Sequence, residues 1–333
     1  MSNDIRKTAV DESISMKISV ILCAYTEQRW QALLAAVDSV RSQTLQPSEI
    51  ILVIDHNPRL LERARRQFEG LLVNENTGDP GLSGARNTGI AAAHGDLLVF
   101  MDEDAAAERD WLERLADGFK EANVLGVGGA VQPGWDGGRP AWFPPEFDWV
   151  VGCTYRGMPE QRSPVRNLIG CNMALARQVF LEIGGFQEGM GRIGTYPAGC
   201  EETELCIRAG QRWPEGKLLY EPQARVRHLI PPSRASLRYF LSRCYAEGLS
   251  KAQVARLVGR DSGLSSERSY ALRTLPQGIL HGLADLVLRF DASGLARAVA
   301  ILAGLAWTTA GFVNGSLTRR IQRPLPVEEL SFE

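Results

Sequence analysis

The segment Leu97-Leu-Val-Phe-Met-Asp-Glu-Asp104 places two carboxylates directly after a run of five apolar residues. Such a run, bounded by polar residues, is typical of a buried strand in an α/β sheet. Sheets of this kind bind ligands at the carboxyl ends of their strands. Asp102 and Asp104 are therefore predicted to lie at a binding site, where their hard oxygen atoms suit Mg²⁺ or Mn²⁺.

Strand-like and helix-like runs alternate on both sides of this segment. We expect strands at 18–23, 50–54, 71–73 and 97–101, and helices at 29–42, 59–68 and from Gly81 to 91–93. This alternation predicts an α/β fold in which a mostly parallel sheet is flanked by helices.

Two later regions depart from this alternation. Residues 126–166 are dense in Gly, Pro and Trp, which predicts turns and short strands. The aromatic residues of 142–149 are expected either to line a sugar or lipid groove or to cap the core. Residues 235–313 are expected to form a helical extension at the carboxyl end. Breaks in it are expected near Gly259–Gly263, at Pro276 and around Asp291–Gly294.

The composition is that of a globular protein in a reducing compartment. Hydrophobic residues make up 44% and charged residues 23% of the 333 residues. The six cysteines show no Cys-x-x-Cys spacing, so we expect small buried thiols and no zinc site. Residues 1–16 lack an apolar core, and we expect a disordered extension rather than a signal peptide.

The charge of the chain is unevenly distributed. Residues 222–320 contain 14 Lys or Arg and 5 Asp or Glu, a balance of +9, although the whole chain carries −2. The same part of the chain contains an uncharged run over 298–318, which is long enough to span a bilayer. Its Thr, Asn and Ser residues favour a buried or interfacial helix, and both alternatives remain open. Basic and apolar character together indicate an anionic membrane surface as a partner, and not nucleic acid.

Seven segments, in their order along the chain, resemble those of family 2 glycosyltransferases, which have the GT-A fold. Within roughly residues 17–245, these are Ile18–Tyr25, Ile50–Asp55, Gly84–Gly89, Asp102–Asp104, Gly184–Phe186, Glu201–Leu205 and His228. We accordingly expect a GT-A catalytic domain over 17–233, a membrane-associated helical region over 234–320 and a tail over 321–333.

The resemblance implies roles for individual residues. A nucleotide-sugar donor would contact Ala24, Tyr25, Glu27, Asp55, Arg86, Asn87, Asp102 and Asn172. The ligands of a Mg²⁺ or Mn²⁺ ion would be Asp102, Asp104 and His228, where His228 could instead contact the diphosphate. The alternative for Arg86 is a structural ion pair with an acidic loop.

The resemblance also implies that Glu202 is the general base, and Glu201 is the alternative. The family usually has Glu-Asp at this point, whereas this chain has Glu-Glu. Helical periodicity places Glu202 at the amino end of a buried helix, a position that favours an ionised carboxylate. The glycine-rich segment 184–199 is expected to be either a lid over the donor or an ordinary surface loop.

The expected function is inverting, metal-dependent transfer of one sugar from a nucleotide-sugar donor to a lipid-linked or membrane-proximal glycan, at the inner face of the cell membrane. Asp55 suits the uracil imide, so UDP is expected, with GDP and dTDP open. Gln211-Arg-Trp213 lacks the spacer of the processive Gln-x-x-Arg-Trp motif, which favours single transfer.

The sequence disfavours three other functions. A sugar nucleotidyltransferase would have a glycine-rich loop after the first strand, where this chain has Ala24–Arg29. A Rossmann oxidoreductase would have Gly-x-Gly-x-x-Gly at the same place. An inactive sugar- or nucleotide-binding scaffold is disfavoured because the carboxylates of both acidic motifs are present.

Overall fold

The computed structural model describes residues 16–318, except for residues 193, 195–197 and 260–264. The expected extension at 1–16, apart from Met16, and the expected tail at 321–333 lie outside the described residues. The expected break near Gly259–Gly263 also lies almost wholly outside them.

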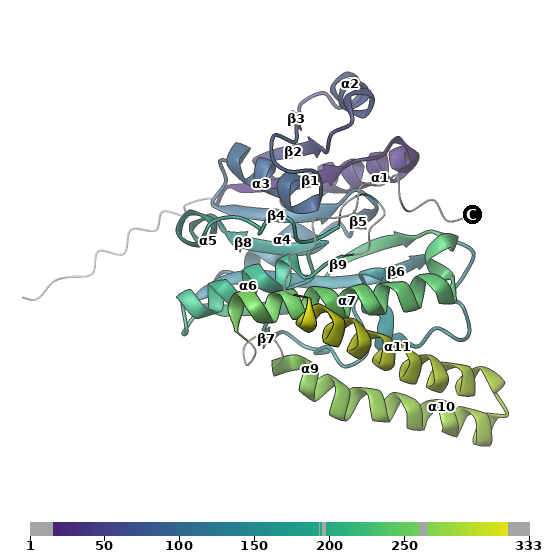
Figure 1. Cartoon of the computed structure of the whole chain (residues 1–333). Helices are drawn as coiled ribbons and strands as arrows, with labels where there is room; N and C mark the ends of the chain where they lie inside the picture. Colours follow the sequence, from purple (N-terminus) through teal and green to yellow (C-terminus); the bar gives the residue numbers. More distant parts are fainter. Residues whose placement is uncertain (1–15, 193, 195–197, 260–264, 319–333) are drawn as a thin grey trace, which may run out of the picture.

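A nine-stranded sheet forms the centre of the molecule, in the order β3-β2-β1-β4-β8-β6-β9-β5, with β7 paired to β9 (Figure 1). The strands are β1 Ile18–Ala24, β2 Glu49–Ile54, β3 Leu72–Glu75, β4 Leu97–Asp102, β5 Ala105–Ala107, β6 Val124–Trp135, β7 Ser163–Val165, β8 Asn172–Ala176 and β9 Lys217–Ile230. Strands β1 to β4 pair in parallel, and β8 pairs antiparallel with both β4 and β6. The α/β class is confirmed, and the sheet as a whole is mixed.

Helices cover both faces of the sheet. They are α1 Trp30–Arg41, α2 Pro58–Gln67, α3 Leu82–Ala92, α4 Trp111–Gly118, α5 Arg177–Ile183, α6 Glu201–Arg212 and α7 Leu237–Val258. Alternate residues of β1 point to opposite faces: Leu22 packs in the core that contains Leu33 of α1, and Ile21 packs in the core that contains Ala85 of α3. Strand periodicity thus produces two apolar layers and leaves the strand ends for polar residues.

The expectation of only turns and short strands over 126–166 was wrong. Strand β6 is 12 residues long and begins before this region. Its glycines serve close packing between strands, because a Cβ atom at Gly129 would collide with the carbonyl oxygen of Ala224 on β9. Downstream of β6, the 3₁₀ helix η2, Pro145–Val151, and the short β7 agree with the expectation.

The carboxyl end is helical as predicted. After the 3₁₀ turn η3, Pro232–Ala235, and α7 come α9 Ser265–Ser269, the π-helix η4 Tyr270–Thr274, α10 Leu275–Arg289 and α11 Ala292–Leu317. Pro276 does not separate two helices, because it occupies the first turn of α10, where its missing N–H is tolerated. The break near Asp291 is confirmed: Phe290 is left-handed, and the Asp291 side chain caps α11.

Helices α10 and α11 form a hairpin at the lower right of Figure 1, and α11 packs along α7. Glycines allow this approach, since a Cβ atom at Gly248 or Gly311 would collide with the backbone of the other helix. The residues of α11 that face away from α7 include Val299 and Leu302, whose exposed fractions are 56% and 54%.

Candidate active site

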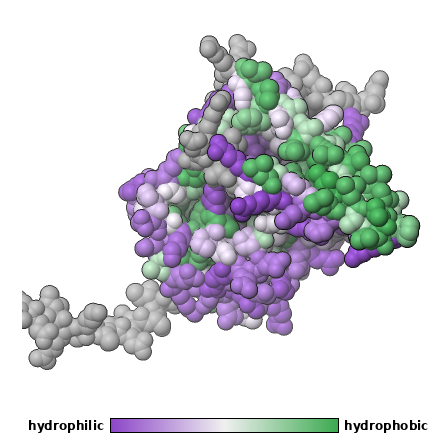
Figure 2. Space-filling model, turned by 90° about the horizontal axis from the view of Figure 1, so that it is seen from below, coloured by the Kyte–Doolittle hydropathy of each residue, from purple (hydrophilic) through white to green (hydrophobic). Residues whose placement is uncertain are grey.

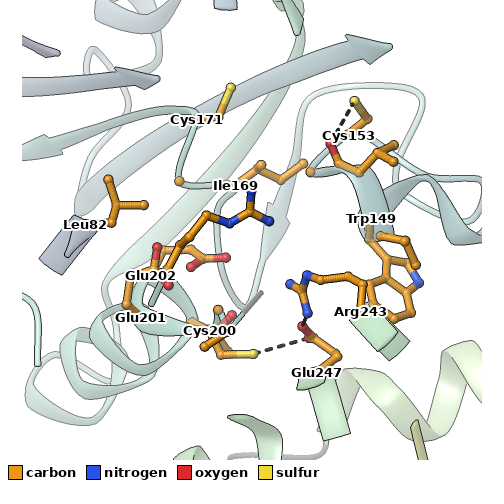
Figure 3. A pocket seen from close by; sticks show the side chains of 18 of the residues that line it. Leu82, Trp149, Cys153, Ile169, Cys171, Cys200, Glu201, Glu202, Arg243 and Glu247 are labelled. Atoms are coloured by element: carbon orange, nitrogen blue, oxygen red, sulfur yellow. Dashed lines mark hydrogen bonds and ion pairs between the residues drawn. The ribbon is translucent and has the colours of Figure 1, made fainter. Parts of the chain in front are cut away.

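A cavity of about 450 Å³ opens at the carboxyl ends of β1, β2 and β4 (Figure 3). Its walls also include η2, the loop before β8, the amino end of α6, and parts of α7, η4 and α11. Of the residues predicted from the sequence, those that line it are Ala24, Tyr25, Asp55, Arg86, Asp102, Asp104, Glu201, Glu202 and His228. Residues from across the chain therefore converge on one site.

Asp55 follows β2 and is held in place at one end of the cavity. Its Oδ1 accepts a hydrogen bond from Asn76 Nδ2 at 2.6 Å, and its Oδ2 accepts one from the Gly81 backbone N–H at 2.8 Å. Gly81, with φ of 121°, is in a conformation that favours glycine. The turn before α3 thus orients the carboxylate. Oδ1 also lies 2.8 Å from His56 Nδ1, so it is Oδ2, bonded to Gly81 N–H, that can accept a further hydrogen bond.

Arg86, buried in α3, joins the two acidic motifs. Its Nη1 donates to Glu201 Oε1 at 2.9 Å, and its Nη2 lies 3.2 Å from Asp102 Oδ1. Nη2 also donates to the carbonyl oxygen of Gly170 at 3.0 Å. The ion pair that the sequence left as an alternative for Arg86 is therefore present, and its partners themselves line the cavity.

Asp104 and His228 form a buried pair. His228 Nε2 lies 3.0 Å from Asp104 Oδ1, because antiparallel β5 and β9 bring Ala105 opposite His228. Burial opposes a charge on His228, but the Asp104 carboxylate raises the pKa of His228 to about 10. In turn, His228 and Arg29 hold the pKa of Asp104 below its ordinary value despite burial.

The sequence analysis missed three charged residues around this pair. Arg29 Nη1 lies 2.9 Å from Asp104 Oδ2 and 2.8 Å from Glu103 Oε1. Burial and the neighbouring Asp104 raise the pKa of Glu103 to about 7. Arg234 of η3 is 6% exposed, and the nearest carboxylate oxygen among the described residues is Asp104 Oδ2, at 3.8 Å. Arg29 ends the polar loop after the first strand and could have been predicted from that position. Arg234 stands in no local sequence pattern that would predict a role in the site.

Glu201 and Glu202 begin α6 and differ in their contacts. Glu201 is paired with Arg86 through Oε1, and its buried Oε2 has no hydrogen-bond partner within the described part of the chain. Glu202 lines the cavity, where burial and the Glu201 carboxylate raise its pKa to about 8. The expectation that the helix terminus keeps Glu202 ionised was wrong, because burial and like charge outweigh the helix dipole.

Three predicted donor contacts have side chains that do not line the cavity. Glu27 is exposed in the 3₁₀ helix η1, Glu27–Arg29. Asn87 exchanges two hydrogen bonds with the Phe186 backbone, and so supports the loop after α5. Asn172 accepts from Trp111 Nε1 at 2.7 Å and donates to two strand carbonyls, so its fully buried side chain serves the sheet. The structure therefore corrects these three positions.

The donor atoms of Asp102, Asp104 and His228 suit a divalent cation. In the described ranges, no group of three His, Cys, Asp or Glu side chains is arranged as a complete metal site. Mg²⁺, however, is commonly held by one or two carboxylates together with water and substrate phosphates. The residues thus fit a cation that arrives with a diphosphate.

All six cysteines are buried and free, as predicted.

The glycine-rich loop before α6 borders this site. Ser83 Oγ donates to the Met190 carbonyl oxygen at 2.8 Å, and Leu82 N donates to that of Arg192 at 3.0 Å. Arg192 and Gly199 line the cavity. Residues 193 and 195–197 lie outside the described chain, and a closing motion of this loop stays a prediction.

Several known proteins with similar sequences or folds are named as glycosyltransferases. Residues 19–184 match the family model for glycosyl transferase family 2. The chain is 32% identical to a glucosyl-dolichyl phosphate glucuronosyltransferase of Haloferax volcanii, over 91% of this chain and 97% of that protein. It is 26% identical to the succinoglycan biosynthesis protein ExoM of Rhizobium meliloti, over 71% of each. The mannosyltransferase PcManGT of Pyrobaculum calidifontis, solved with GDP-Man and Mn²⁺, has a TM-score of 0.57 at 15% identity, covering 92% of this chain and 88% of that one.

Proposed function

The chain belongs to glycosyl transferase family 2, and from that premise we propose that it transfers one sugar, with inversion, from a nucleotide-diphosphate donor to a lipid-linked acceptor. The observation that carries the proposal is the convergence of Asp55, Arg86, the Asp104–His228 pair and Glu202 on one cavity. Glycosyltransferase activity excludes a sugar nucleotidyltransferase and an inactive scaffold.

The reaction removes a proton from the acceptor hydroxyl and places negative charge on the leaving diphosphate. In the proposal, different sides of the cavity serve these two needs. Glu202 accepts the proton of the acceptor hydroxyl as that oxygen bonds to the anomeric carbon. The bond from that carbon to the diphosphate breaks on the opposite side, which inverts the configuration and releases a nucleoside diphosphate. Arg234 lies beside Asp104, on the side where positive charge stabilises the departing phosphates.

Asp102, Asp104 and His228 are the residues that would hold Mg²⁺ or Mn²⁺, whose charge supplies Lewis-acid neutralisation of the diphosphate. Arg86 holds Asp102 and Glu201 at fixed positions, 3.2 Å and 2.9 Å from its guanidinium nitrogens. These two contacts join Asp102, on the side of the leaving diphosphate, to Glu201, the neighbour of the proposed base Glu202. Arg86 therefore acts as a positioning residue in the proposal.

The nucleotide is proposed to be UDP, because the oriented Asp55 carboxylate can accept the N–H of a uracil ring. A panel of UDP-, GDP- and dTDP-sugars, assayed for hydrolysis and transfer with Mn²⁺ or Mg²⁺, tests the function. We expect UDP-sugars to be consumed about tenfold faster than GDP-sugars, because Asp55 is placed for the imide N–H of a pyrimidine. Thymine carries the same imide N–H, so dTDP-sugars report on the 5-methyl group and the missing 2′-hydroxyl. Turnover of none of them would contradict the proposed function.

The acceptor is proposed to be lipid-linked, in keeping with the dolichyl phosphate named for the Haloferax relative. Helix α11, Ala292–Leu317, is long and apolar enough to cross a membrane. Because α11 packs on α7 through glycines, we propose instead that the α10–α11 hairpin lies on the inner leaflet of the cell membrane, an anionic surface. Its outward residues form the apolar patch at the right of Figure 2. They include Leu280, Val287, Leu288, Phe290, Val299 and Leu302.

Replacing both Leu288 and Phe290 with Glu should release the protein from vesicles that contain phosphatidylglycerol, by about tenfold or more in partition coefficient. Both side chains are at least 76% exposed, so the fold is retained, and each loses about 1.5–3 kcal/mol of transfer energy. Cosedimentation at low salt is the measurement. Leu181→Glu on α5, a residue of similar exposure, is the matched control. A wild-type protein that fails to bind these vesicles would contradict the membrane proposal.

A further inference from the structure

The cavity extends past the residues that the transfer reaction uses. Trp149 of η2, Tyr270 of η4, Leu275 of α10, and Leu305 and Phe312 of α11 line this second part. Their side chains are predominantly apolar, and the Tyr270 hydroxyl is already bonded to the Glu146 carbonyl oxygen at 2.6 Å. The proposed chemistry gives them no role, although they make up a large share of the wall.

The second part of the cavity leads to the outer surface along α11. Leu305 lines the cavity and is still 38% exposed, and Thr309, one turn further, is an exposed residue that also lines it. Leu302, 54% exposed, lies three residues before Leu305 on the same helix. One helix therefore connects the inside of the cavity with the apolar patch of Figure 2. An apolar chain that leaves the cavity here stays in contact with apolar side chains.

A positively charged side chain lies at the inner end of this route. Arg243 of α7 projects into the cavity between Trp149 and Glu247 (Figure 3), and its Nη1 donates to Glu247 Oε2 at 2.7 Å. This is its single hydrogen bond to the residues that the structure describes, which leaves four N–H groups for a ligand. Lys251 Nζ lies 3.2 Å from the other oxygen of Glu247 and lines the same cavity.

Arg243 lies beside the segment that leads into α6 and the proposed base. A Cβ atom at Gly199 would lie 2.8 Å from Arg243 Nη2, so the glycine leaves room for the guanidinium. Cys200 Sγ donates to Glu247 Oε1 at 3.2 Å, and Cys200 directly precedes Glu201 and Glu202. The arginine and the base are therefore linked through the segment that begins α6.

We propose that this part of the cavity binds the acceptor as a phosphorylated polyisoprenoid. Its phosphate contacts Arg243, and its apolar chain runs past Leu305, Thr309 and Phe312 to the membrane. A sugar carried on the phosphate would then extend toward Glu202. This proposal rests on the proposed function, since it assigns the acceptor of the same site.

Binding of geranylgeranyl phosphate to the full-length protein, measured by calorimetry without a sugar donor, tests the proposal. We expect it to bind at least tenfold more tightly than geranylgeraniol, which lacks the phosphate, and than inorganic phosphate, which lacks the chain. If geranylgeraniol binds as tightly as geranylgeranyl phosphate, the cavity is only an apolar surface. If inorganic phosphate binds as tightly, the cavity is only an anion site. Either result overturns the proposal.

Two variants locate the ligand. Thr309→Trp places an indole in the route and should weaken geranylgeranyl phosphate at least tenfold, whereas Ala306→Trp, an exposed residue of α11 outside the cavity, should not. The pair Arg243→Gln with Glu247→Gln removes the arginine together with its carboxylate partner, leaves Lys251 paired with Glu267, and should weaken binding of the phosphate ligand at least tenfold relative to the alcohol. Unchanged binding in Thr309→Trp overturns the proposal even if the double variant fails to fold.

These measurements separate the two proposals. Donor hydrolysis without lipid binding would refute the acceptor site alone. Lipid binding in a protein that consumes no nucleotide sugar would refute the proposed function and leave the binding site standing.

Discussion

Replacing Glu202 with Gln should lower kcat by about 10²-fold or more and leave donor affinity nearly unchanged. The amide is close in size to the carboxylate but cannot accept the proton of the acceptor hydroxyl. None of the ion pairs between described residues involves Glu202, and the neighbouring pair Arg86–Glu201 stays intact, so the variant should keep its structure. Single-turnover transfer and calorimetric titration with UDP measure the two effects.

The pH dependence provides a second measurement of the same group. Because the pKa of Glu202 is raised to about 8, its basic form increases as the pH rises. The kcat/KM of the wild type should therefore increase up to about pH 8, and that increase should be lost in Glu202→Gln. Glu201→Gln tests the alternative base, and because the Glu201 carboxylate raises the pKa of Glu202, the pH profile of that variant should move to lower pH. A dead Glu201→Gln beside an active Glu202→Gln would assign the base to Glu201.

Replacing Asp104 with Asn should reduce transfer by about 10³-fold, equivalent to about 4 kcal/mol of transition-state stabilisation. Asn keeps the shape but removes the charge that faces Arg29 and His228 and that would hold the cation. EDTA should abolish wild-type activity, and Mn²⁺ or Mg²⁺ should restore it.

Two controls accompany this variant. Asp110→Asn, a half-buried residue six positions along the chain that does not line the cavity, should retain full activity. Thermal unfolding of Asp104→Asn should show a folded protein, so that lost activity reports the site and not the fold. Full wild-type activity in EDTA would contradict a metal-dependent mechanism.

Much of the fold follows from local sequence patterns. Strands β1, β2 and β4 are apolar runs followed by polar residues, and the carboxylates Asp55 and Asp102 come at their ends. Strand and helix periods are properties of neighbouring residues, so a single sequence displays them. The same holds for the two acidic motifs and for the helices of the carboxyl end.

The wrong predictions concern residues whose role depends on contacts with residues far away along the chain. The glycines of β6 resemble turn residues, but Gly129 is required because Ala224 of a neighbouring strand comes close. Asn172 stands in a segment that resembles a donor-binding one, yet Trp111 occupies its side-chain oxygen. Hydrogen-bond partners far apart along the chain leave no local pattern, and Arg234 beside Asp104 was missed for the same reason.

The sequence by itself determined the family, the α/β class and the acidic residues of the site, because these depend on short segments and their order. Only the tertiary structure decided the partners and protonation of those residues. The pairing of β5 with β9 brings His228 to Asp104, and burial beside Glu201 raises the pKa of Glu202. Only the packing of α11 on α7 shows that an apolar helix also lines the catalytic cavity. Charge interactions and burial depend on distances in space, which the order of residues does not contain.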